Sequence, residues 1–321
     1  MAGALITLPE YAKGLEKGDL RRPIIEMFSK ESDVFQVLRF EGLGSAIYEG
    51  YREAVLPSAA FRGINAPAES SDGTIEPFQE ATYVIDSYLD VDRAIVDRAG
   101  EARRNEKEAM KVKAIIRLVT DALFKGDNTT NPKEPDGLQK RADRFNRVIP
   151  NNTGSGGGAL SLAKLDQAIA ETRSPTHIIM PYGMKRYMPA MVRSTTVAGF
   201  VQRTGMNDLG GVGQGGYYYA DLPILFGYPI DKNQRLLPFT EAAYGGGTAA
   251  CSSIYVLSMN PEDGGLKGIE LKPMDVKDVG LVLTGDTPLY RTWFTWDLGF
   301  VIENEYTLTR LSSITDAAIV A

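Results

Sequence analysis

The strongest constraint on the fold of this chain is a run of 66 residues, 35 to 100, that is extended in pattern and acidic in charge. It contains eleven acidic residues, five arginines and no lysine, for a net charge of −6. Between 65 and 77 it is rich in Asn, Pro, Ser, Asp and Gly, which predicts a flexible turn between two arms. Such a segment carries too many charges to bury a core of its own. We expect a long β-hairpin that overhangs its own domain and covers a neighbouring copy.

Strand periodicity is clearest in the second half of this run, where apolar and acidic residues alternate. The apolar face is Tyr83, Ile85, Leu89 and Val91, and the acidic face is Asp86, Asp90 and Asp92.

The pattern becomes helical from Glu101 to Lys125, and Gly126 is placed as a C-terminal stop. The apolar stripe of this long helix is Ala109, Val112, Ile116, Val119 and Leu123. Residues 101 to 148 hold twelve basic and eight acidic residues, a net charge of +4. An acidic arm followed by a basic helical region favours self-association through the two.

Composition fits a folded protein with a core, since 43% of the 321 residues are hydrophobic and 24% are charged. We find no signal-peptide pattern and no apolar run of about 18 residues, and so expect no membrane association. The single cysteine, Cys251, excludes an intramolecular disulfide framework. A net charge of −6 gives no uniform attraction to nucleic acid.

Two short helices, Leu8–Lys17 and Arg22–Lys30, are expected to form an amino-terminal arm, the first with a Thr7–Glu10 capping box. Residues 128 to 152 are expected to form a loop and a short β-hairpin around Phe145–Ile149. The glycine-rich run Thr153–Gly158 is the best candidate for a domain hinge.

An α+β region is expected beyond that run, with helices at Leu160–Thr172 and Met184–Arg193 and strands at His177–Met180 and Gly280–Thr284. Alternation from Phe294 to Leu308 predicts one long closing strand whose apolar face packs on the long helix. The glycine- and tyrosine-rich residues 215 to 247 fit either contacts between copies or ordinary loops.

Catalytic patterns are weak. Gly211 to Gly216 matches G-x-G-x-x-G, but no clear strand leads into it and Tyr217 to Tyr219 favour a strand after it. The single histidine, His177, is expected to be a hydrogen-bonded residue at a strand start, and Cys251 a small packed side chain. The carboxylate pairs Asp90 with Asp92 and Glu303 with Glu305 are expected to be charge rows on strands, although a glycosidase pair stays open. We therefore expect no catalytic residue, cofactor or metal.

The order of arm, overhanging hairpin, long helix, inserted α/β domain and closing strand resembles the Hong Kong 97 (HK97) fold of the major capsid proteins of tailed bacteriophages. Short motifs agree with the extended loop of one group of these proteins: Leu56-Pro57, Phe61-Arg62-Gly63 with Asn65, and Leu89-Asp90-Val91-Asp92. Pro175 to Met180 and Leu225-Phe-Gly227-Tyr-Pro229 are similar to parts of their axial domain.

The resemblance implies an α+β, HK97-like chain divided into five parts. These are an N-terminal arm (1–34), an extended loop with flanking strands (35–100), a peripheral domain with the spine helix (101–157), an axial domain (158–285) and a long strand returning to the peripheral domain (286–321).

It also implies pentamers and hexamers that form an icosahedral head around double-stranded DNA, assembled in the host cytoplasm, with a portal and a decoration protein as further partners. The chain begins directly at the arm, which suggests a separate scaffold protein or none. A lysine cross-link of the kind some members form is not expected, because residues 35 to 100 contain no lysine. The alternatives are an encapsulin-type compartment and, last, a glycan hydrolase or binding module.

Contacts between copies are expected at the extended loop and at the spine helix. The loop residues are Leu56, Pro57, Phe61, Arg62, Asn65, Glu69, Asp72 and Glu76, and the helix residues are Arg103, Arg104, Lys107 and Lys111.

Overall fold

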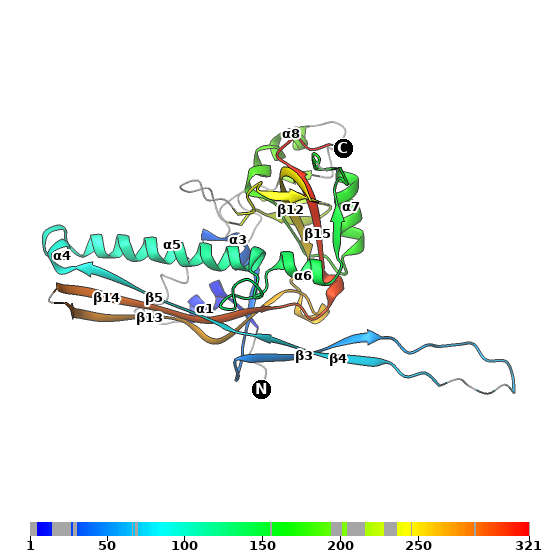
Figure 1. Cartoon of the computed structure of the whole chain (residues 1–321), viewed down its shortest axis with the longest axis horizontal. Coiled ribbons are helices and arrows are strands. Elements are labelled where there is room, and N and C mark those ends of the chain that lie inside the picture. The colour runs from blue at the N-terminus through cyan, green and yellow to red at the C-terminus, as the bar shows by residue number, and fades with distance from the viewer. Residues whose placement is uncertain are drawn as a thin grey trace.

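A computed structural model shows an elongated molecule with a long sheet, a second unit standing over one end of it, and a hairpin that projects beyond both (Figure 1). The described residues are 5–14, 27, 31–65, 67, 70–154, 156–193, 201–203, 216–227, 236–244, 246–285 and 287–320. Within them the strands form a five-stranded sheet, an eight-stranded sheet and a separate two-stranded hairpin.

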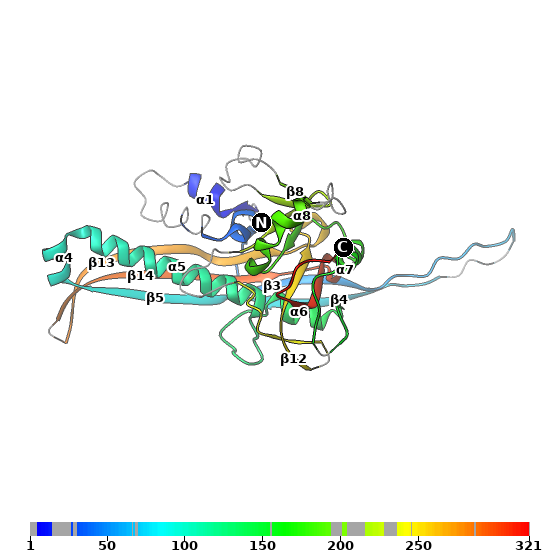
Figure 2. The same cartoon turned by 90° about the horizontal axis from the view of Figure 1, so that it is seen from above.

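The five-stranded sheet, here called the peripheral sheet, has the order β1-β2-β13-β14-β5. Its strands are β1 (Ile6–Thr7), β2 (Arg39–Gly42), β13 (Lys267–Thr284), β14 (Thr287–Val301) and β5 (Tyr83–Asp92). The spine helix α5 (Glu101–Lys125) lies along this sheet, after the short helix α4 (Arg93–Ala99) (Figures 1 and 2). Strand β5 forms one edge of the sheet and is followed directly in the sequence by α4 and α5.

One apolar core joins α5 to β14. Val112, Ile116, Val119 and Leu123 of the helix are buried in the same cluster as the apolar residues of the strand, Phe294, Trp296, Leu298 and Phe300. Both bounds predicted for the helix are confirmed, as is the packing of the alternating strand against it.

The closing strand is shorter than predicted, because β14 ends at Val301. The chain then turns, makes a 3-10 turn η3 (Glu305–Thr307) and enters β15 (Leu308–Thr315) in the other sheet. Asn304 caps the 3-10 turn by accepting the Tyr306 N–H at 3.0 Å. Apolar residues continue to alternate through this turn, so the sequence pattern does not show where the strand ends. The prediction that Glu303 and Glu305 share a strand is wrong.

The eight-stranded sheet, here called the axial sheet, has the path β6-β15-β12-β7-β10-β9-β8, with β11 paired to β12. Besides β15, its strands are β6 (Val148–Pro150), β7 (His177–Ile179), β8 (Val201–Arg203), β9 (Tyr217–Tyr219), β10 (Leu222–Leu225), β11 (Glu241–Ala243) and β12 (Gly247–Leu257). The helical elements of this unit are α7 (Leu162–Glu171), the 3-10 turn η1 (Tyr182–Arg186) and α8 (Met188–Arg193), and η2 (Pro261–Asp263) precedes β13. A second apolar core lies here, built around Leu165, Met184, Ile254 and Leu311.

Two expectations for residues 128 to 158 are wrong. The segment before Phe145 forms helix α6 (Leu138–Arg144), and β6 pairs in parallel with β15 instead of forming a local hairpin. The glycine-rich run is not a hinge between the sheets, because β6 on one side and Gly158 on the other both pair with β15. Gly157 (φ 63°) packs tightly there, since a side chain would meet Cys251 Sγ at 2.5 Å.

The predicted boundary at 285 also differs from the structure. Strand β13 pairs with β14 along most of its length, so residues 267–284 belong to the peripheral sheet and 285 falls at the turn of one hairpin. The sequence around β13 is too charged and irregular to show a strand of this length.

In the arm, α1 (Leu8–Gly14) starts as predicted, and the Thr7 N–H donates to Glu10 at 2.9 Å. The second predicted arm helix lies outside the described residues except for Met27. The arm returns through α3 (Asp33–Val37), whose Val34 and Phe35 enter the core shared with α5.

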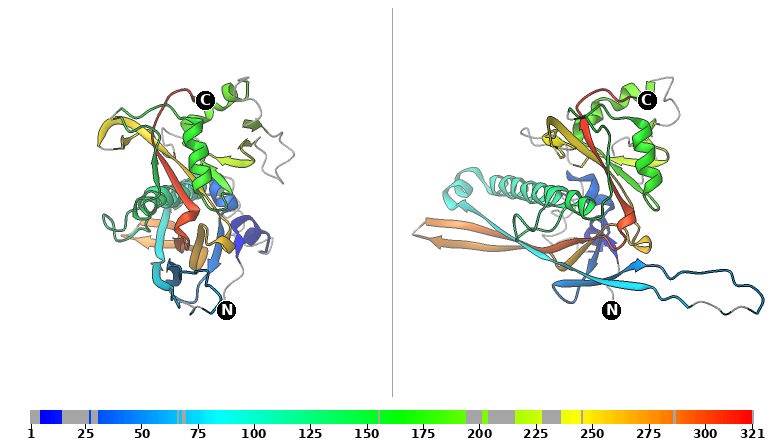
Figure 3. Two further views of the ribbon diagram at one scale, coloured as in Figure 1. Left: turned by 90° about the vertical axis from the view of Figure 1, so that its right-hand side faces the viewer. Right: turned by 45° about the vertical axis from the view of Figure 1, so that its right-hand side comes forward.

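The extended hairpin is present, as expected. Strands β3 (Ile47–Val55) and β4 (Thr74–Ala81) pair from Ile47↔Ala81 to Val55↔Thr74. They pair with no other strand in the described part of the chain, and the hairpin points away from both sheets (Figure 3).

Candidate interaction surface

The hairpin has two unlike faces because side chains alternate along each strand. On one face, Tyr48, Arg52, Phe78 and Glu80 are partly buried against the chain's own body. On the other, Ile47, Glu49, Tyr51, Glu53 and Val55 of β3 are all exposed. We call the second one the bare face.

The first face is anchored at the base of the hairpin by Arg52. Its Nε donates to the Glu303 carbonyl at 2.8 Å, and Nη2 donates to the Ile302 carbonyl at 2.7 Å. The guanidinium also lies 4.1 Å from the Phe78 ring centre and 4.8 Å from that of Phe145. Arg52 thereby satisfies two carbonyls where β14 ends.

Lys267 is a second anchor and is almost fully buried. Its Nζ lies 2.7 Å from Glu41, 2.8 Å from Glu303 and 3.0 Å from the Tyr48 hydroxyl, which in turn donates to Glu303. Burial alone would lower the pKa of Lys267, but its bonds to Glu303 and Glu41 raise that pKa above its ordinary value. The lysine therefore stays charged.

The third anchor is Arg141 of α6. It binds both oxygens of Glu80, at 2.6 and 2.9 Å, and donates to the Phe300 carbonyl at 2.8 Å. Arg144 adds a contact to Glu80 at 3.3 Å. Glu80, at the base of the acidic hairpin, is thus paired with two arginines of α6 in the same chain.

The bare face and the tip make a contrasting surface of uncovered apolar side chains. The exposed fraction is 74% for Tyr51, 72% for Leu56 and 95% for Ile64, and Phe61 is fully exposed. Isolated apolar residues on a surface are ordinary, but a contiguous patch of large ones marks an interaction site.

Most of the predicted loop residues lie on this surface. Leu56, Pro57, Phe61, Arg62, Asn65 and Asp72 are exposed there, and Glu69 lies outside the described residues. Glu76 is also exposed, but it is paired across the hairpin with Arg52 and so lies on the anchored face. Asn65 has a positive φ of 65°, as a turn residue does.

The predicted basic residues of the spine helix differ among themselves. Arg103 is exposed and pairs only with Glu106 among the described residues, at 2.9 Å. Arg104 forms ion pairs within its own chain, with Asp278 at 2.6 Å and with Glu108 at 3.0 Å. Lys107 and Lys111 are partly buried. Within one chain these residues do not meet the hairpin tip, which extends to the opposite end of the molecule (Figure 1).

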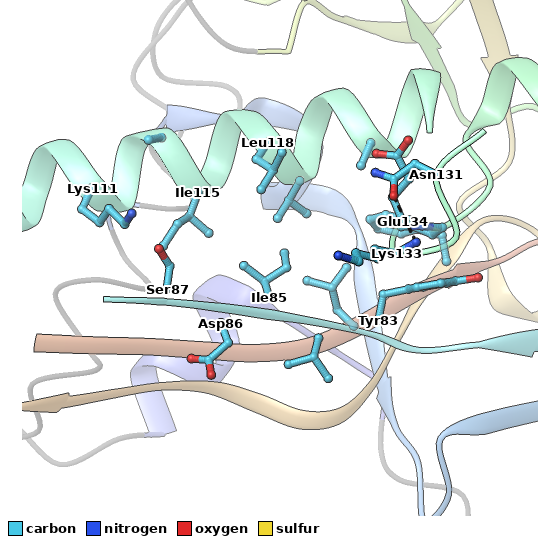
Figure 4. Close-up of a pocket in the computed structure, with 17 residues that line it drawn as sticks. Tyr83, Ile85, Asp86, Ser87, Lys111, Ile115, Leu118, Asn131, Lys133 and Glu134 are labelled. Atoms are coloured by element: carbon cyan, nitrogen blue, oxygen red, sulfur yellow. Dashed lines mark hydrogen bonds between the residues drawn. The ribbon is translucent and has the colours of Figure 1, made fainter. Parts of the chain in front are cut away.

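A groove of about 360 Å³ lies between α5 and the edge strand β5 (Figure 4). Residues 83–87 form one side of it, Lys111, Ile115 and Leu118 the other, and the loop 131–135 closes one end. Strand β5 pairs with β14 on one side and with no described strand on the other, so it is an edge strand of the described sheet.

His177 and Cys251 lie in the fold as expected. His177 begins β7 and its Nδ1 lies 2.8 Å from Thr176 Oγ1, and burial lowers its pKa to about 4. Cys251 is buried, as expected. Gly211 to Gly215 lie outside the described residues.

Asp90 and Asp92 have different partners. Asp90 binds Arg291 through both oxygens at 2.7 Å, and that bond lowers its pKa. Asp92 accepts the Ala94 N–H at the start of α4. No cluster of three metal-ligating side chains occurs among the described residues. No described helix is both long and apolar enough to span a bilayer.

Sequence reasoning missed the anchors Arg52, Arg141 and Lys267. Alternation within residues 47–55 separates Tyr48 and Arg52 from the bare face, so that signal was present. The partners are Glu303 for Arg52, Glu80 for Arg141, and Glu41 with Glu303 for Lys267. They are too distant in sequence for a local pattern to reveal.

Several solved structures share this arrangement at low sequence identity. An encapsulin, SrpI of Synechococcus elongatus PCC 7942, has a TM-score of 0.62 at 12% identity and covers 97% of this chain and 96% of that chain. A chain from Mycobacterium phage Bobi has a TM-score of 0.58 at 12% identity, covering 90% and 91%. The capsid of an empty GTA particle gives 0.54 at 11% identity, covering 94% of each. No curated protein matches the chain. These likenesses define the fold as the HK97 capsid fold.

A sequence match identifies the family. Residues 16–186, more than half of the chain, match the family described as "Major capsid protein GP7", and the chain belongs to it. It is a capsid-forming protein, so the expected HK97-type fold and the expectation of a major capsid protein are confirmed.

Proposed function

We propose that this chain is the major subunit of a tailed-phage head, assembled as pentamers and hexamers into an icosahedral shell around double-stranded DNA. Its role is structural and not catalytic. A separate scaffold protein, a portal and a decoration protein are its further partners, and assembly takes place in the host cytoplasm. The observation that carries the proposal is the hairpin, whose bare face and tip hold large apolar side chains that are exposed.

In this proposal, the hairpin of one copy lies on a neighbour, and the receiving surface is the groove between α5 and β5. The bare face offers Ile47, Tyr51 and Val55, with Glu49 and Glu53 between them. The groove offers apolar α5 residues with Lys111 beside them, and the edge strand β5. Strand addition at such an edge supplies affinity through main-chain bonds and specificity through alternate side chains.

The test is Phe61→Asp, examined by electron microscopy of purified particles. Phe61 is fully exposed, so the change leaves the fold of the chain intact, and we expect shells to be lost. Phe61→Leu keeps an apolar side chain and is expected to keep shells. Normal shells from Phe61→Asp, with an unchanged fold, would contradict the proposed role of the tip.

The encapsulin-type compartment is the second candidate, favoured by the match to SrpI over 97% of this chain. Nuclease-treated particles separate the two. Protected double-stranded DNA supports the phage head, whereas protected protein cargo without DNA supports the compartment.

A further inference from the structure

The base of the hairpin lies where the chain passes between its two sheets. Among the described residues the chain crosses three times: through 126–147 from α5 to β6, through 258–266 from β12 to β13, and through 302–307 from β14 to β15. Any change in the angle between the sheets must bend these three segments.

Each crossing segment is bonded to the hairpin or to a residue that holds it. Arg52 of β3 holds the third crossing by the carbonyls of Ile302 and Glu303. Glu80 of β4 holds the first crossing by Arg141. Tyr48 of β3 binds Lys267, which directly follows the second crossing.

The crossings are also bonded to one another. The Gly264 carbonyl accepts the N–H groups of Glu303 at 3.1 Å and Asn304 at 3.0 Å, so the second and third crossings move together. Gly264 has a φ of +70°, and a side chain there would meet Asn304 at 3.1 Å. A side chain at position 264 would therefore strain this contact.

The ion pairs at the base of the hairpin are buried, so breaking them to move the hairpin costs free energy. The exposed side-chain fraction is 1% for Arg141 and 9% for Lys267. A charged group in such a site must keep its partners, because an unpaired buried charge is strongly unfavourable.

We propose that the direction of the hairpin and the angle between the axial and peripheral sheets are mechanically coupled through this cluster. A hairpin held by a neighbouring copy then biases the sheet angle, and a tilt of the axial sheet redirects the hairpin. The coupling is a property of one chain. Only its use during assembly depends on the proposed function.

Distance measurements by pulsed electron resonance test the coupling. In a Cys251→Ala background, one spin-label pair, Ala54→Cys with Asn105→Cys, reports the hairpin against α5. A second pair, Ala163→Cys with Asn105→Cys, reports the axial unit against α5. All three label sites are exposed, and dilution with unlabelled chains removes distances between copies.

Two variants perturb opposite sides of the cluster. Gly264→Val displaces residues 303–304, to which Arg52 and Tyr48 of the hairpin are bonded, and we expect it to shift the distance of the first pair. Arg52→Met removes the hairpin's grip without touching the axial sheet, and we expect it to shift the distance of the second pair, because coupling is reciprocal. Arg93→Gln removes an exposed helix pair and is the control, with both distances unchanged.

If each variant shifts only the distance on its own side, the coupling is overturned and the cluster is a local anchor. Should Gly264→Val fail to fold, Gly264→Ala provides the milder strain. Shells formed by the unmodified protein are judged separately by microscopy, so failure of the coupling and failure of the proposed function are distinguishable.

Discussion

Arg141 and Glu80 form a two-point ion pair, with Nη1 2.6 Å from Oε1 and Nη2 2.9 Å from Oε2, that joins α6 to the base of the hairpin. The geometry is the fork that a guanidinium presents to a carboxylate. Because Arg141 also donates to the carbonyls of Asp136 and Phe300, one side chain connects the hairpin, β14 and the segment that leads to the axial sheet.

Replacing Arg141 with Met should destabilise the chain strongly. The change leaves Glu80 with only Arg144 among its described partners and two carbonyls without their donor. Removing one member of a buried pair costs about 3–5 kcal/mol. Denaturant unfolding of the isolated chain measures the loss. Arg103→Gln, which breaks an exposed pair with Glu106, is the control and should cost less than about 1 kcal/mol. Equal losses would show that Arg141 is not an anchor.

A charge exchange tests where the hairpin lies on its neighbour. Glu53→Lys on the bare face and Lys111→Glu at the groove should each reduce shell yield, more at low salt than at high salt, because salt screens exposed charges. The double variant restores opposite charges and should recover part of the yield. Particle counts by microscopy give the result, with Arg98→Glu as the control, an exposed residue of the neighbouring helix α4 that does not line the groove. Unchanged yields in both single variants would place the hairpin elsewhere.

The sequence predicted those parts of the fold that depend on local periodicity. The spine helix showed 3.6-residue spacing up to a terminal glycine, and Phe294 to Phe300 showed clean alternation, so both were found. Of strand β13, only the last part was predicted, at Gly280–Thr284. The rest was missed because it carries Lys272, Asp275, Lys277 and Asp278 on an irregular ladder. Local pattern is weak where neither face of a strand is buried.

The interaction surface was predicted in outline from charge and turn composition. Its uncovered apolar residues lie where the loop was expected. Within one chain, α6 supplies Arg141 and Arg144 to Glu80 at the hairpin base, whereas the contact between copies at the spine helix stays a prediction. The bonds of Arg52, Arg141 and Lys267 join residues up to 251 positions apart, and only the tertiary fold brings them together.

His177 should make the chain less stable in mild acid. Burial lowers its pKa in the folded state to about 4, below the ordinary 6.5. The unfolded chain therefore binds the proton first, and stability contributed by the neutral ring is present above pH 6.5 and lost as the pH falls toward 4. The loss is at most roughly 3 kcal/mol. Unfolding of His177→Gln across this range should show a smaller fall than the unmodified chain. Parallel curves would contradict the assignment.

Asp33, in contrast to His177, should make the chain less stable as the pH rises. Its carboxylate is buried at the start of α3 and accepts the N–H groups of Phe226 and Gly227, each at 2.8 Å, which ties the arm to the end of β10. Burial raises its pKa to about 6, although the backbone bonds oppose the shift. The folded chain then binds the proton more tightly than the unfolded one, so this group's contribution to stability is greatest below about pH 4 and declines as the pH rises through 6.

Asp33→Asn removes the titrating group and should abolish that decline. It should also lower stability at every pH, because one of the two N–H donors would face the amide NH2 group. The measurement is the difference in unfolding free energy between variant and unmodified chain at pH 4, 5, 6 and 7. We expect the difference to be largest at pH 4 and to shrink toward pH 7. A difference that stays constant from pH 4 to pH 7 would show that the Asp33 carboxylate is charged over this whole range. Burial would then not raise its pKa.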